Sequence, residues 1–556
     1  MKHHPNFQHR DLHYLAGNGH QRPTKRRIEV ATRIVLGLAG MVVVGTLLLM
    51  LPGMGVNGRL TFMQAFFTAT SALTVTGLST IAAGRDLTLA GQIVLLLLIQ
   101  FGGVGYMFAA AAALRIIRRR VSLMDRLALS SSLGLDTPEA IMKVLKRSLI
   151  GILVIEGSGA FLLFWKWWLS GTVDLDHVFF YAIFHAVSAF CNAGFDLFNG
   201  LPQYPDGVPS DNFTLIVLGL LIGLGALGIP VLSELFTWRW RRRFSLHTRL
   251  TLAVVAFLIV FGWVGLWLPE ATHGVLVDVP LGSQLVRTWF QSVSARTAGF
   301  AGLPHFDQLQ PESRLMLIIL MFIGSAPASM GGGLTTGTFA VLLLALWGYA
   351  RGTDHAEIGG RRIAVGTVRR AGAVLTVGLF VVLTATWLIL LVQDFTLDQV
   401  LFEVVSAFAT CGLSLGITGQ LNVFSQFVIA GVMFWGRLGA LTIVSAIGQQ
   451  SKRTQLVQYP EESVLIGSWR LELRDWRFGN LQSLISIYSC LKPITSANRR
   501  SISGISCWSW LEKGKRGAWR SLSQGSCQPL VVCTTSRANG SPCSCRQPVR
   551  MASTSD

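Results

Sequence analysis

The chain has 556 residues, of which 51% are hydrophobic and only 13% are charged, and its mean hydropathy is +0.51. A soluble domain carries about 25% charged residues, so these values exclude an ordinary soluble protein. The net charge of +19 does not indicate nucleic-acid binding, because 25 of the 47 Lys and Arg residues gather in four clusters at 2–33, 115–147, 239–249 and 351–370. Short loops rich in Lys and Arg stay in the cytoplasm, so these clusters predict membrane topology, with membrane lipids of anionic headgroup as their partners.

Seven stretches of the chain contain no Asp, Glu, Lys or Arg: 34–58, 87–114, 212–233, 250–269, 315–350, 371–393 and 404–436. About 20 apolar residues span a bilayer as a helix, so we predict an all-α polytopic membrane protein. The polar residues 1–32 come first, and the apolar run after them begins too late and is too long for a signal peptide. We therefore expect 1–32 to be a cytoplasmic N-terminus.

Four segments between these stretches read alike. Each has an aromatic residue ten positions before a glycine and Leu or Phe after it, and the segments are Phe67–Leu78, Phe184–Phe195, Trp289–Phe300 and Phe402–Leu413. Their glycines are 117, 105 and 113 positions apart, and the third copy has its Ser-Ala pair one position closer to the glycine. The spacing predicts four repeats, at 33–120, 140–243, 245–350 and 367–450.

Each repeated segment is too short to cross the membrane. The roughly 12 residues before each glycine make a helix of about 18 Å, whereas the hydrocarbon core is about 30 Å thick. The segment must enter and leave by the same face, and non-helical backbone at that depth needs protein or a water-filled cavity around it. We therefore predict four helix–pore-helix–helix repeats with pseudo-fourfold symmetry around one central pore.

The loops at the ends of the pore helices are predicted to bind a monovalent cation. Glycine permits backbone conformations that turn carbonyls inward, and rings of carbonyl oxygens can replace the hydration shell of such an ion. Helix C-termini add partial negative charge, and without Asp or Glu in the loops a carboxylate site for a divalent metal is not predicted. The expected ion-binding residues are Thr74, Val75, Thr76, Gly77, Cys191, Asn192, Ala193, Gly194, Arg296, Thr297, Ala298, Gly299, Thr410, Cys411 and Gly412.

The charge-free stretch 315–350 is too long for one membrane-spanning helix. Its 36 residues would extend about 54 Å, and its middle, 324–338, contains five Gly and Pro327. Because Gly and Pro break helices, we predict two half-helices joined by a loop under the glycine loops. A kinked helix packed on small residues is the alternative.

Three further residues and one motif are candidates for function. Arg437 stands in a stretch otherwise free of charge, where it faces the pore or pairs with backbone carbonyls, unless its side chain snorkels to the interface. Glu156 is expected to pair with a neighbouring helix, with a coupling-ion site as the alternative, and His185 is expected to be structural. Gly223–Gly228 matches a dinucleotide-binding fingerprint in the wrong context, so close helix packing explains it better.

These motifs resemble a known family. Thr74–Leu78, with its three weaker copies, is similar to the selectivity filter of the Trk/Ktr/HKT superfamily of K⁺ transporters. Gln100–Tyr106 resembles the Gly-rich start of the second helix of repeat one, Met433–Thr442 the Arg-bearing final helix, and Tyr459–Gly467 the usual C-terminal end. The resemblance covers about 33–467 and is closest to the Ktr-type membrane subunit, because repeat one comes first, without the extra helix pair of Trk-type members.

The resemblance implies K⁺ uptake through a bacterial inner membrane by a homodimer, controlled by a cytoplasmic RCK-type regulatory subunit that binds ATP or ADP. In this superfamily, glycine at all four filter positions goes with K⁺ selectivity, whereas Ser at the first position goes with Na⁺. Two alternatives stay open: Na⁺ as a coupling ion, and a Na⁺-preferring transporter of the same fold. In Ktr-type relatives the broken helix is an intramembrane gate, although they often carry a basic residue where this chain has Thr335. The gate would here comprise Gly324, Ser325, Pro327, Ser329, Gly331, Gly332, Gly333 and Arg437.

Residues 468–556 differ from the rest of the chain. They follow the family-like C-terminus at 451–467, contain no spanning run, and hold six of the eight Cys residues at spacings that fit no metal site. We expect this tail to result from a frameshift or readthrough, with a regulatory extension as the alternative.

Two other classes of function compete with transport. A membrane-embedded enzyme needs catalytic groups that converge at membrane depth, such as a His/Asp pair or a Ser with a base, and the spanning runs offer none. A purely structural scaffold would not need four glycine loops. We therefore predict a transporter without enzymatic activity.

Overall fold

The computed structural model describes residues 30–104, 141–204, 206–241, 244–353, 356–358 and 361–439. All of these residues belong to the first of two compact units, which comprises 1–454. The predictions for the chain before Val30, for 451–467 and for the tail 468–556 lie outside the described residues.

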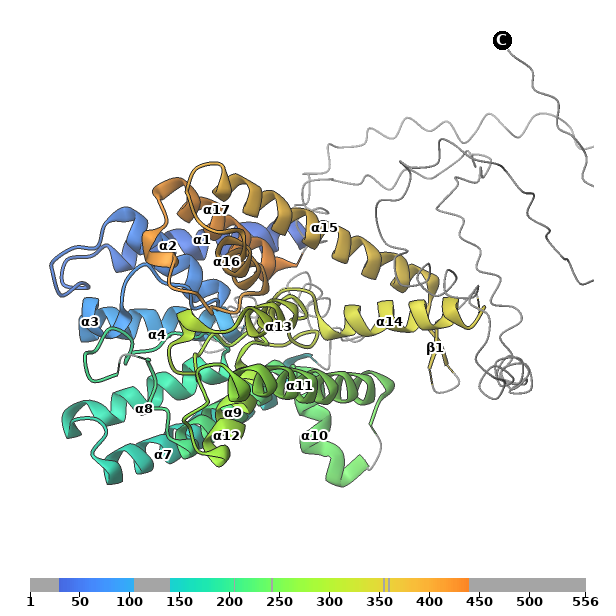
Figure 1. Ribbon diagram of the computed structural model, residues 1–556, viewed down its shortest axis with the longest axis horizontal. Helices are drawn as coiled ribbons and strands as arrows, with labels where there is room; N and C mark the ends of the chain where they lie inside the picture. The colour runs from blue at the N-terminus through green and yellow to red at the C-terminus, as the bar shows by residue number, and fades with distance from the viewer. Residues whose placement is uncertain are drawn as a thin grey trace, which may run out of the picture. The chain divides into compact units, whose positions relative to one another are not determined.

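The described chain is mostly helical, as predicted, and one order of elements recurs along it (Figure 1). A helix is followed by a short helix of 13–16 residues and then by another helix. The four groups are α1 (Val30–Leu49), α2 (Phe62–Thr74) and α4 (Leu89–Val104); α7 (Ile141–Ser170), α8 (Leu175–Phe190) and α9 (Asn212–Ala226); α11 (Leu246–Thr272), α12 (Leu281–Ser294) and α13 (Pro311–Phe322); and α15 (Val365–Leu390), α16 (Leu397–Ala409) and α17 (Val423–Leu438).

The remaining elements connect or extend these groups. Helix α10 (Ile229–Arg241) follows the second group and α14 (Thr336–Ala350) the third, while α3 (Ala83–Asp86) and two 3₁₀ turns lie in connections. A small antiparallel hairpin of β1 (Glu357–Ile358) and β2 (Arg361–Arg362) is the one departure from an all-helical fold among the described residues.

Several helices are suited to cross a membrane by length and composition. Among the described residues three helices are long and apolar enough alone, at Ser148–Ser170, Leu246–Thr272 and Val365–Leu390, and the bent pair α9–α10 is a fourth if it counts as one span. The large apolar side chains on their outer faces are exposed, Phe257 by 59% and Phe380 by 70%. Because exposed apolar surface of this extent fits lipid rather than water, the fold is that of a multi-pass membrane protein.

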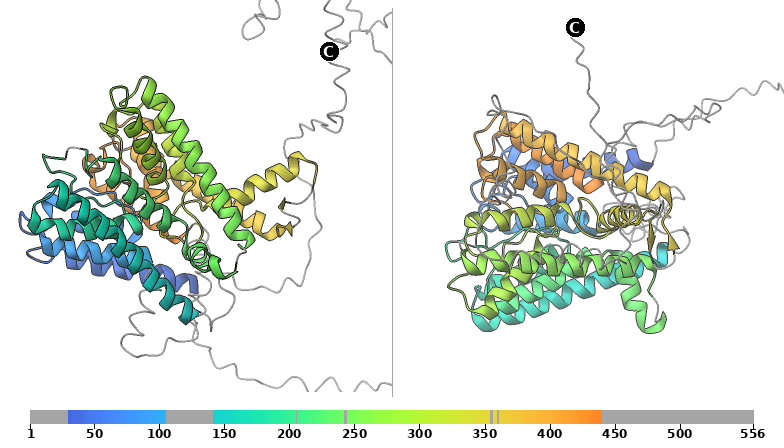
Figure 2. Two further views of the ribbon diagram at one scale, coloured as in Figure 1. Left: turned by 90° about the horizontal axis from the view of Figure 1, so that it is seen from below. Right: turned by 45° about the vertical axis from the view of Figure 1, so that its right-hand side comes forward.

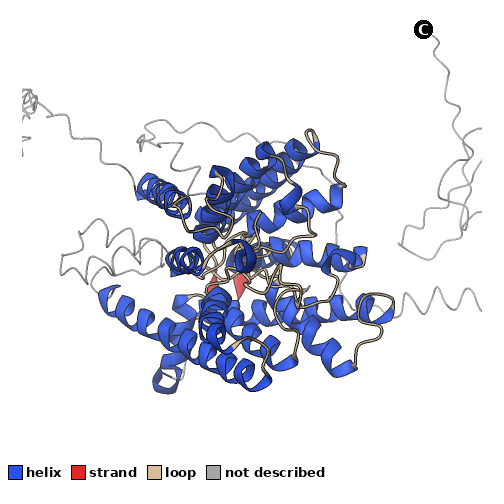
Figure 3. Ribbon diagram, turned by 90° about the vertical axis from the view of Figure 1, so that its left-hand side faces the viewer, coloured by secondary structure: helices blue, strands red, loops and turns tan. Residues whose placement is uncertain are grey.

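The short helices lie inside the bundle. Helix α2 packs on α1 and α4, α8 on α7 and α9, α12 on α11 and α9, and α16 on α15 and α17. Helix α17 of the last group also packs on α2 of the first, so the fourth group contacts the first. Figure 2 shows the long helices running alongside one another, and Figure 3 shows the helices arranged about a centre where loops meet.

Close contacts between a glycine and a carbonyl recur in three of the groups. In each, the helix after the short helix places a glycine against the backbone carbonyl near the C-terminus of that short helix, where no Cβ could fit. The pairs are Gly102 with Leu73, Gly225 with Phe190, and Gly436 with Phe408, where an added Cβ would lie 2.4, 1.9 and 2.0 Å from the carbonyl oxygen.

The apolar run 212–233, which the sequence predicts to span the membrane, forms a bent pair of helices. Helix α9 ends at Ala226 and α10 begins at Ile229, at an angle of 104°. Gly228 stands at the break with φ of +84°, and the Ile229 N–H donates to the carbonyl of Ala328, 3.1 Å away. The break thus includes a contact with a segment about a hundred residues away in the sequence.

We predict that Gly225→Ala destabilises the protein whereas Gly223→Ala does not. A Cβ on Gly225 would lie 1.9 Å from the Phe190 carbonyl oxygen, while one on Gly223 meets nothing within 4 Å. Overpacking of this kind costs about 1–3 kcal/mol. Thermal unfolding in detergent, followed by size-exclusion chromatography, should show a lower Tm for Gly225→Ala only, and equal Tm values for the two variants would refute the contact.

Candidate functional site

The loop after each short helix turns in the same way. The residue two positions before each repeated glycine has a positive φ, with values of 55° at Val75, 56° at Asn192, 90° at Thr297 and 50° at Thr410. Such values are uncommon outside glycine, above all for β-branched Val and Thr. Their recurrence at one position in all four loops marks a backbone conformation that the surrounding structure imposes.

The four glycine loops meet in a closed ring. Each repeated glycine lies against the carbonyl oxygen of the residue that precedes the glycine of the next copy, and the last copy lies against the first. The pairs are Gly77 with Ala193, Gly194 with Ala298, Gly299 with Cys411, and Gly412 with Thr76, where an added Cβ would lie 2.5, 2.6, 2.3 and 2.1 Å from the oxygen. The ring is therefore made of backbone, and no side chain fits at its glycines.

A serine in each short helix fastens the loop that follows. The hydroxyl oxygens of Ser71 and Ser406 accept the N–H of Gly77 and Gly412, both at 3.0 Å. In the other two copies the serine donates instead, and the bonds are Ser188 to the Phe195 carbonyl at 2.8 Å and Ser294 to the Phe300 carbonyl at 2.6 Å. Each loop is thus held by its own helix as well as by its neighbour.

The third loop is one residue shorter than the others. The N–H of Ala298 bonds to the carbonyl of Ser294, four residues back, at 2.8 Å. In the other three loops the bond of the same kind reaches five residues back, as from Thr76 to Ser71, also at 2.8 Å. In the third copy the Ser-Ala pair stands one position closer to the glycine, and the backbone hydrogen bond to that serine is shorter by the same one residue.

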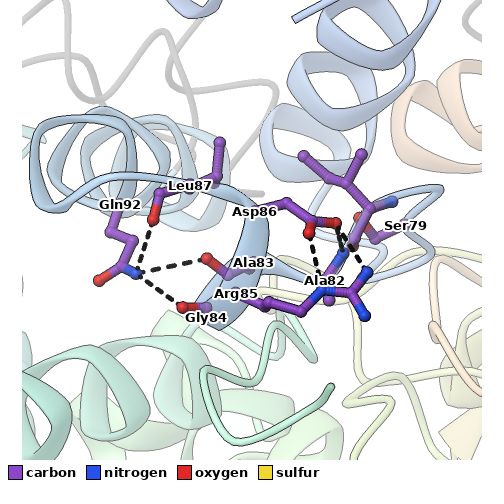
Figure 4. Close-up of polar contacts among 9 residues, drawn as sticks. Ser79, Ala82, Ala83, Gly84, Arg85, Asp86, Leu87 and Gln92 are labelled. Atoms are coloured by element: carbon purple, nitrogen blue, oxygen red, sulfur yellow. Dashed lines mark hydrogen bonds and ion pairs between the residues drawn. The ribbon is translucent and has the colours of Figure 1, made fainter. Parts of the chain in front are cut away.

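The connection between the first glycine loop and α4 is braced by side chains (Figure 4). The Gln92 side-chain amide donates to the carbonyls of Ala83 and Leu87, at 3.4 and 3.2 Å. The Asp86 carboxylate accepts the Ala82 N–H at 2.9 Å and the Arg85 guanidinium at 2.8 Å. This brace matters for the ring because the connection packs on the next one: a Cβ on Gly84 would lie 1.8 Å from the carbonyl oxygen of Leu197, three residues after Gly194.

The segment between α13 and α14, which we call the gate loop (residues 323–335), lies against the third and fourth glycine loops. Its two ends, Ile323 and Leu334, pair in an isolated β-bridge. The Gly332 N–H donates to the Thr410 hydroxyl oxygen at 2.9 Å. An added Cβ on Gly331 would lie 2.1 Å from the hydroxyl oxygen of Thr297. The predicted break of 315–350 into two half-helices is thus present, and the kinked-helix alternative is not.

The gate loop is also bound to the break between α9 and α10. The N–H groups of Ala326 and Met330 donate to the carbonyls of Ala226 and Gly225, at 3.0 and 3.3 Å. Together with the bond from Ile229 to Ala328, these contacts attach the middle of the loop to the second group of helices. We did not predict this docking site from the sequence, although glycine and proline in Gly228-Ile-Pro are signs of a helix break.

Arg437 joins the gate loop to α4. Its guanidinium donates to the carbonyls of Met330 and Gly102, and to that of Gly103 at 3.2 Å. Of the alternatives considered for this residue, pairing with gate-loop carbonyls is the one that the structure contains. The side chain does not extend away from the bundle, as a snorkelling arginine would.

The other polar candidates lie behind the second glycine loop. Glu156 accepts from the Gln100 amide at 3.2 Å and from the Cys191 thiol at 3.7 Å, so it pairs with a neighbouring helix as expected. His185 is fully buried, with ring nitrogens 2.7 Å from the Tyr181 carbonyl and 3.0 Å from the Asp196 carboxylate. These contacts give both residues partners within the bundle.

The chain is similar to known cation transporters. Residues 41–454 match the model of the family described as TrkH, cation transport protein. The chain is 36% identical over 444 residues to Ktr system potassium uptake protein B of Vibrio alginolyticus, covering 78% of this chain and 94% of that protein. It is 31% identical over 457 residues to potassium/sodium uptake protein NtpJ of Enterococcus hirae, covering 80% of this chain and 98% of that protein.

A solved structure shares the fold. The crystal structure of the potassium transporter TrkH from Vibrio parahaemolyticus matches with a TM-score of 0.59 and covers 76% of this chain and 85% of its own. The sequence identity in this comparison is 19%, so it bears on the arrangement of the helices alone.

We predict that Asp86→Asn lowers the Tm at pH 7 but not in acid. The Arg85 guanidinium, with help from the Ala82 N–H, holds the pKa of the Asp86 carboxyl below its ordinary value. The ionised carboxylate stabilises the fold at pH values above about 3.9, the pKa of an Asp carboxyl in the unfolded chain. This stabilisation disappears as the pH falls through the lower pKa that the carboxyl has in the folded protein.

The measurement is the difference in Tm between wild type and Asp86→Asn in detergent, as the pH is lowered from 7 toward about 3. Asp278→Asn, at an exposed carboxyl in another connection, is the control. A difference that stays constant with pH would contradict the role of the ionised carboxylate.

Proposed function

Because the chain belongs to the TrkH family of cation transport proteins, we propose that it is the ion-translocating subunit of a Ktr-type K⁺ uptake system. Members of this family are multi-pass membrane transporters and not enzymes. Two observations support K⁺ as the transported ion. They are the name of the relative from Vibrio alginolyticus and the presence of glycine at all four repeated positions.

The single observation that carries the proposal is the closed ring of glycine loops. We infer that K⁺ passes along the axis of this ring through a selectivity filter with pseudo-fourfold symmetry, formed by the residues that the sequence motif predicted. Backbone carbonyl oxygens can replace water around a monovalent ion, and the pore helices direct their partially negative C-termini toward the ring. Backbone contacts between neighbouring copies would hold the carbonyls at fixed spacing, which selection between ions of different size requires.

We infer that the gate loop closes the pore below the filter. Its contacts with Thr297 and Thr410 place it directly against two of the four filter loops. Its bonds to α9 and to Arg437 would hold the closed position, and breaking them would open a path for the ion. Thr335 caps the start of α14 by accepting the Thr338 N–H at 3.3 Å, so a basic side chain at this position is not needed to end the loop.

The assembly we propose is a homodimer in a bacterial inner membrane, with the N-terminus and the basic loops on the cytoplasmic side. A cytoplasmic RCK-type subunit that binds ATP or ADP would act on the gate loop from that side. The basis is the family membership together with the basic clusters, since short basic loops stay in the cytoplasm. Nucleotide enters the proposal only through that subunit.

Na⁺-preferring transport is the second candidate. The relative from Enterococcus hirae is named as a potassium/sodium uptake protein and matches at 31% identity. Na⁺ would then be the transported ion, or would be coupled to K⁺. Competition between the two ions in the following measurement separates these candidates.

We predict that Gly77→Ser reduces K⁺ uptake and its preference over Na⁺ by about tenfold or more, a change that corresponds to about 1.4 kcal/mol. A Cβ on Gly77 would lie 2.5 Å from the Ala193 carbonyl oxygen, so the ring must deform. The measurement is growth and ⁸⁶Rb⁺ uptake in bacteria deficient in K⁺ uptake, with and without a regulatory subunit, under increasing Na⁺.

Gly40→Ser is the matched control, because a Cβ on this α1 glycine meets nothing within 4 Å. Unchanged uptake and selectivity in Gly77→Ser would rule out the ring as the filter. Wild-type uptake that Na⁺ inhibits more strongly than K⁺ does would favour the second candidate, and no uptake even with a partner would reject both.

A further inference from the structure

Arg296 is a buried charge without an opposite charge beside it. The residue is 2% exposed, and none of the ion pairs among the described residues includes it. Its guanidinium donates to the carbonyl of Gly324 at 3.2 Å, while its Nε has no partner in the described structure. A charge inside a membrane protein is costly, so it is a candidate for function.

The carbonyl that Arg296 binds belongs to the stem of the gate loop. Gly324 comes directly after Ile323, which pairs with Leu334 at the other end of the loop. A Cβ on Gly324 would lie 2.3 Å from the Gly332 carbonyl oxygen and 3.4 Å from the Thr297 methyl group. Arg296 therefore acts where both ends of the gate loop and the third filter loop meet.

The corresponding positions in the other copies have no side chain that donates to the gate loop. Three positions before the glycine, Thr74 donates to the Thr70 carbonyl of its own helix at 2.7 Å, and the fourth copy has Ala409. Cys191 of the second copy turns to Gln100 and Glu156, away from the gate loop. Ala409 touches the gate loop, since an added Cβ on Gly333 would lie 3.0 Å from its Cα, but it has no side-chain donor. Among the four described loops, the third is the one with a charged side chain at this position that donates to the gate loop.

We propose that Arg296 is a positioning residue that couples the third filter loop to the gate loop and holds the gate closed. This inference rests on the proposed function. The charged side chain ties the loop stem to the filter, so the gate loop cannot leave its position without breaking the Arg296–Gly324 bond. Arg437 binds the middle of the same loop, at the Met330 carbonyl.

The test uses the purified full chain in liposomes without any partner protein, with ⁸⁶Rb⁺ uptake as the readout. Arg296→Met keeps the length of the side chain and removes its donors, and it should raise the initial rate by about tenfold, the fold-change that about 1.4 kcal/mol produces. Na⁺ should also compete at lower concentrations, because the third filter loop loses a support. Arg296→Lys should restore part of the wild-type behaviour.

Arg287→Met is the matched control. Arg287 lies on α12, the helix that precedes the Arg296 loop, and donates to Ser210 at 2.9 Å rather than to the gate loop. Arg437→Gln, which removes the other arginine that binds the loop, is the reference for a loosened gate. Size-exclusion chromatography establishes that each variant is folded, and if Arg296→Met is not, an intermediate rate in Arg296→Lys decides in favour of the proposal.

A rate and Na⁺ competition in Arg296→Met equal to those of Arg287→Met would overturn the proposal, as would complete loss of transport in a folded Arg296→Met protein. The wild type with its regulatory subunit separates the two levels of failure. If it carries ⁸⁶Rb⁺ while Arg296→Met matches the control, only the role of Arg296 is wrong. If it carries none, the proposed function is wrong and this inference with it.

Discussion

The structure depends on one constraint: backbone that is not helical lies in the interior of a membrane protein, and its polar groups must find partners there. Lipid offers no hydrogen bonds, so each N–H or C=O left unpaired in the membrane costs several kcal/mol. The chain supplies partners from three sources. They are a serine in each short helix, the adjacent loop in the ring, and arginine side chains that reach backbone carbonyls.

The same constraint explains why glycine is placed where it is. At Gly102, Gly225 and Gly436 the glycine lets one helix approach the carbonyl end of another, and a Cβ would fall within 2.4 Å of that oxygen. These residues sit within regular helices, so their role is close packing rather than conformational freedom. At Gly77 and its counterparts glycine is needed for both reasons: φ is positive, and the neighbouring carbonyl leaves no room for a side chain.

How far the sequence can predict this fold depends on whether the determining contacts are local. The four glycine segments were recognisable because each loop repeats one pattern, and the break in 315–350 because Gly and Pro are concentrated there. The break after Ala226 was not, since Gly228 is compatible with tight helix packing, and the Ala328 carbonyl that accepts the Ile229 N–H is distant in sequence. Arg296 was assigned to the filter from its position alone, but the direction of its side chain is set by the gate loop.

The third group differs from the other three in how the helix after its short helix packs. Where the other groups place a helix glycine against a carbonyl of the short helix, the third has Ala295, whose carbonyl accepts the Cys411 thiol at 3.4 Å. Helix α13 ends at Phe322, and the gate loop that follows it contacts Thr297 and Thr410 of the third and fourth glycine loops. In the proposed function, a loop held by a few backbone bonds and two arginines is released by breaking those contacts, while the ring keeps its own serine and glycine contacts. One chain would then combine a fixed filter with a gate that opens.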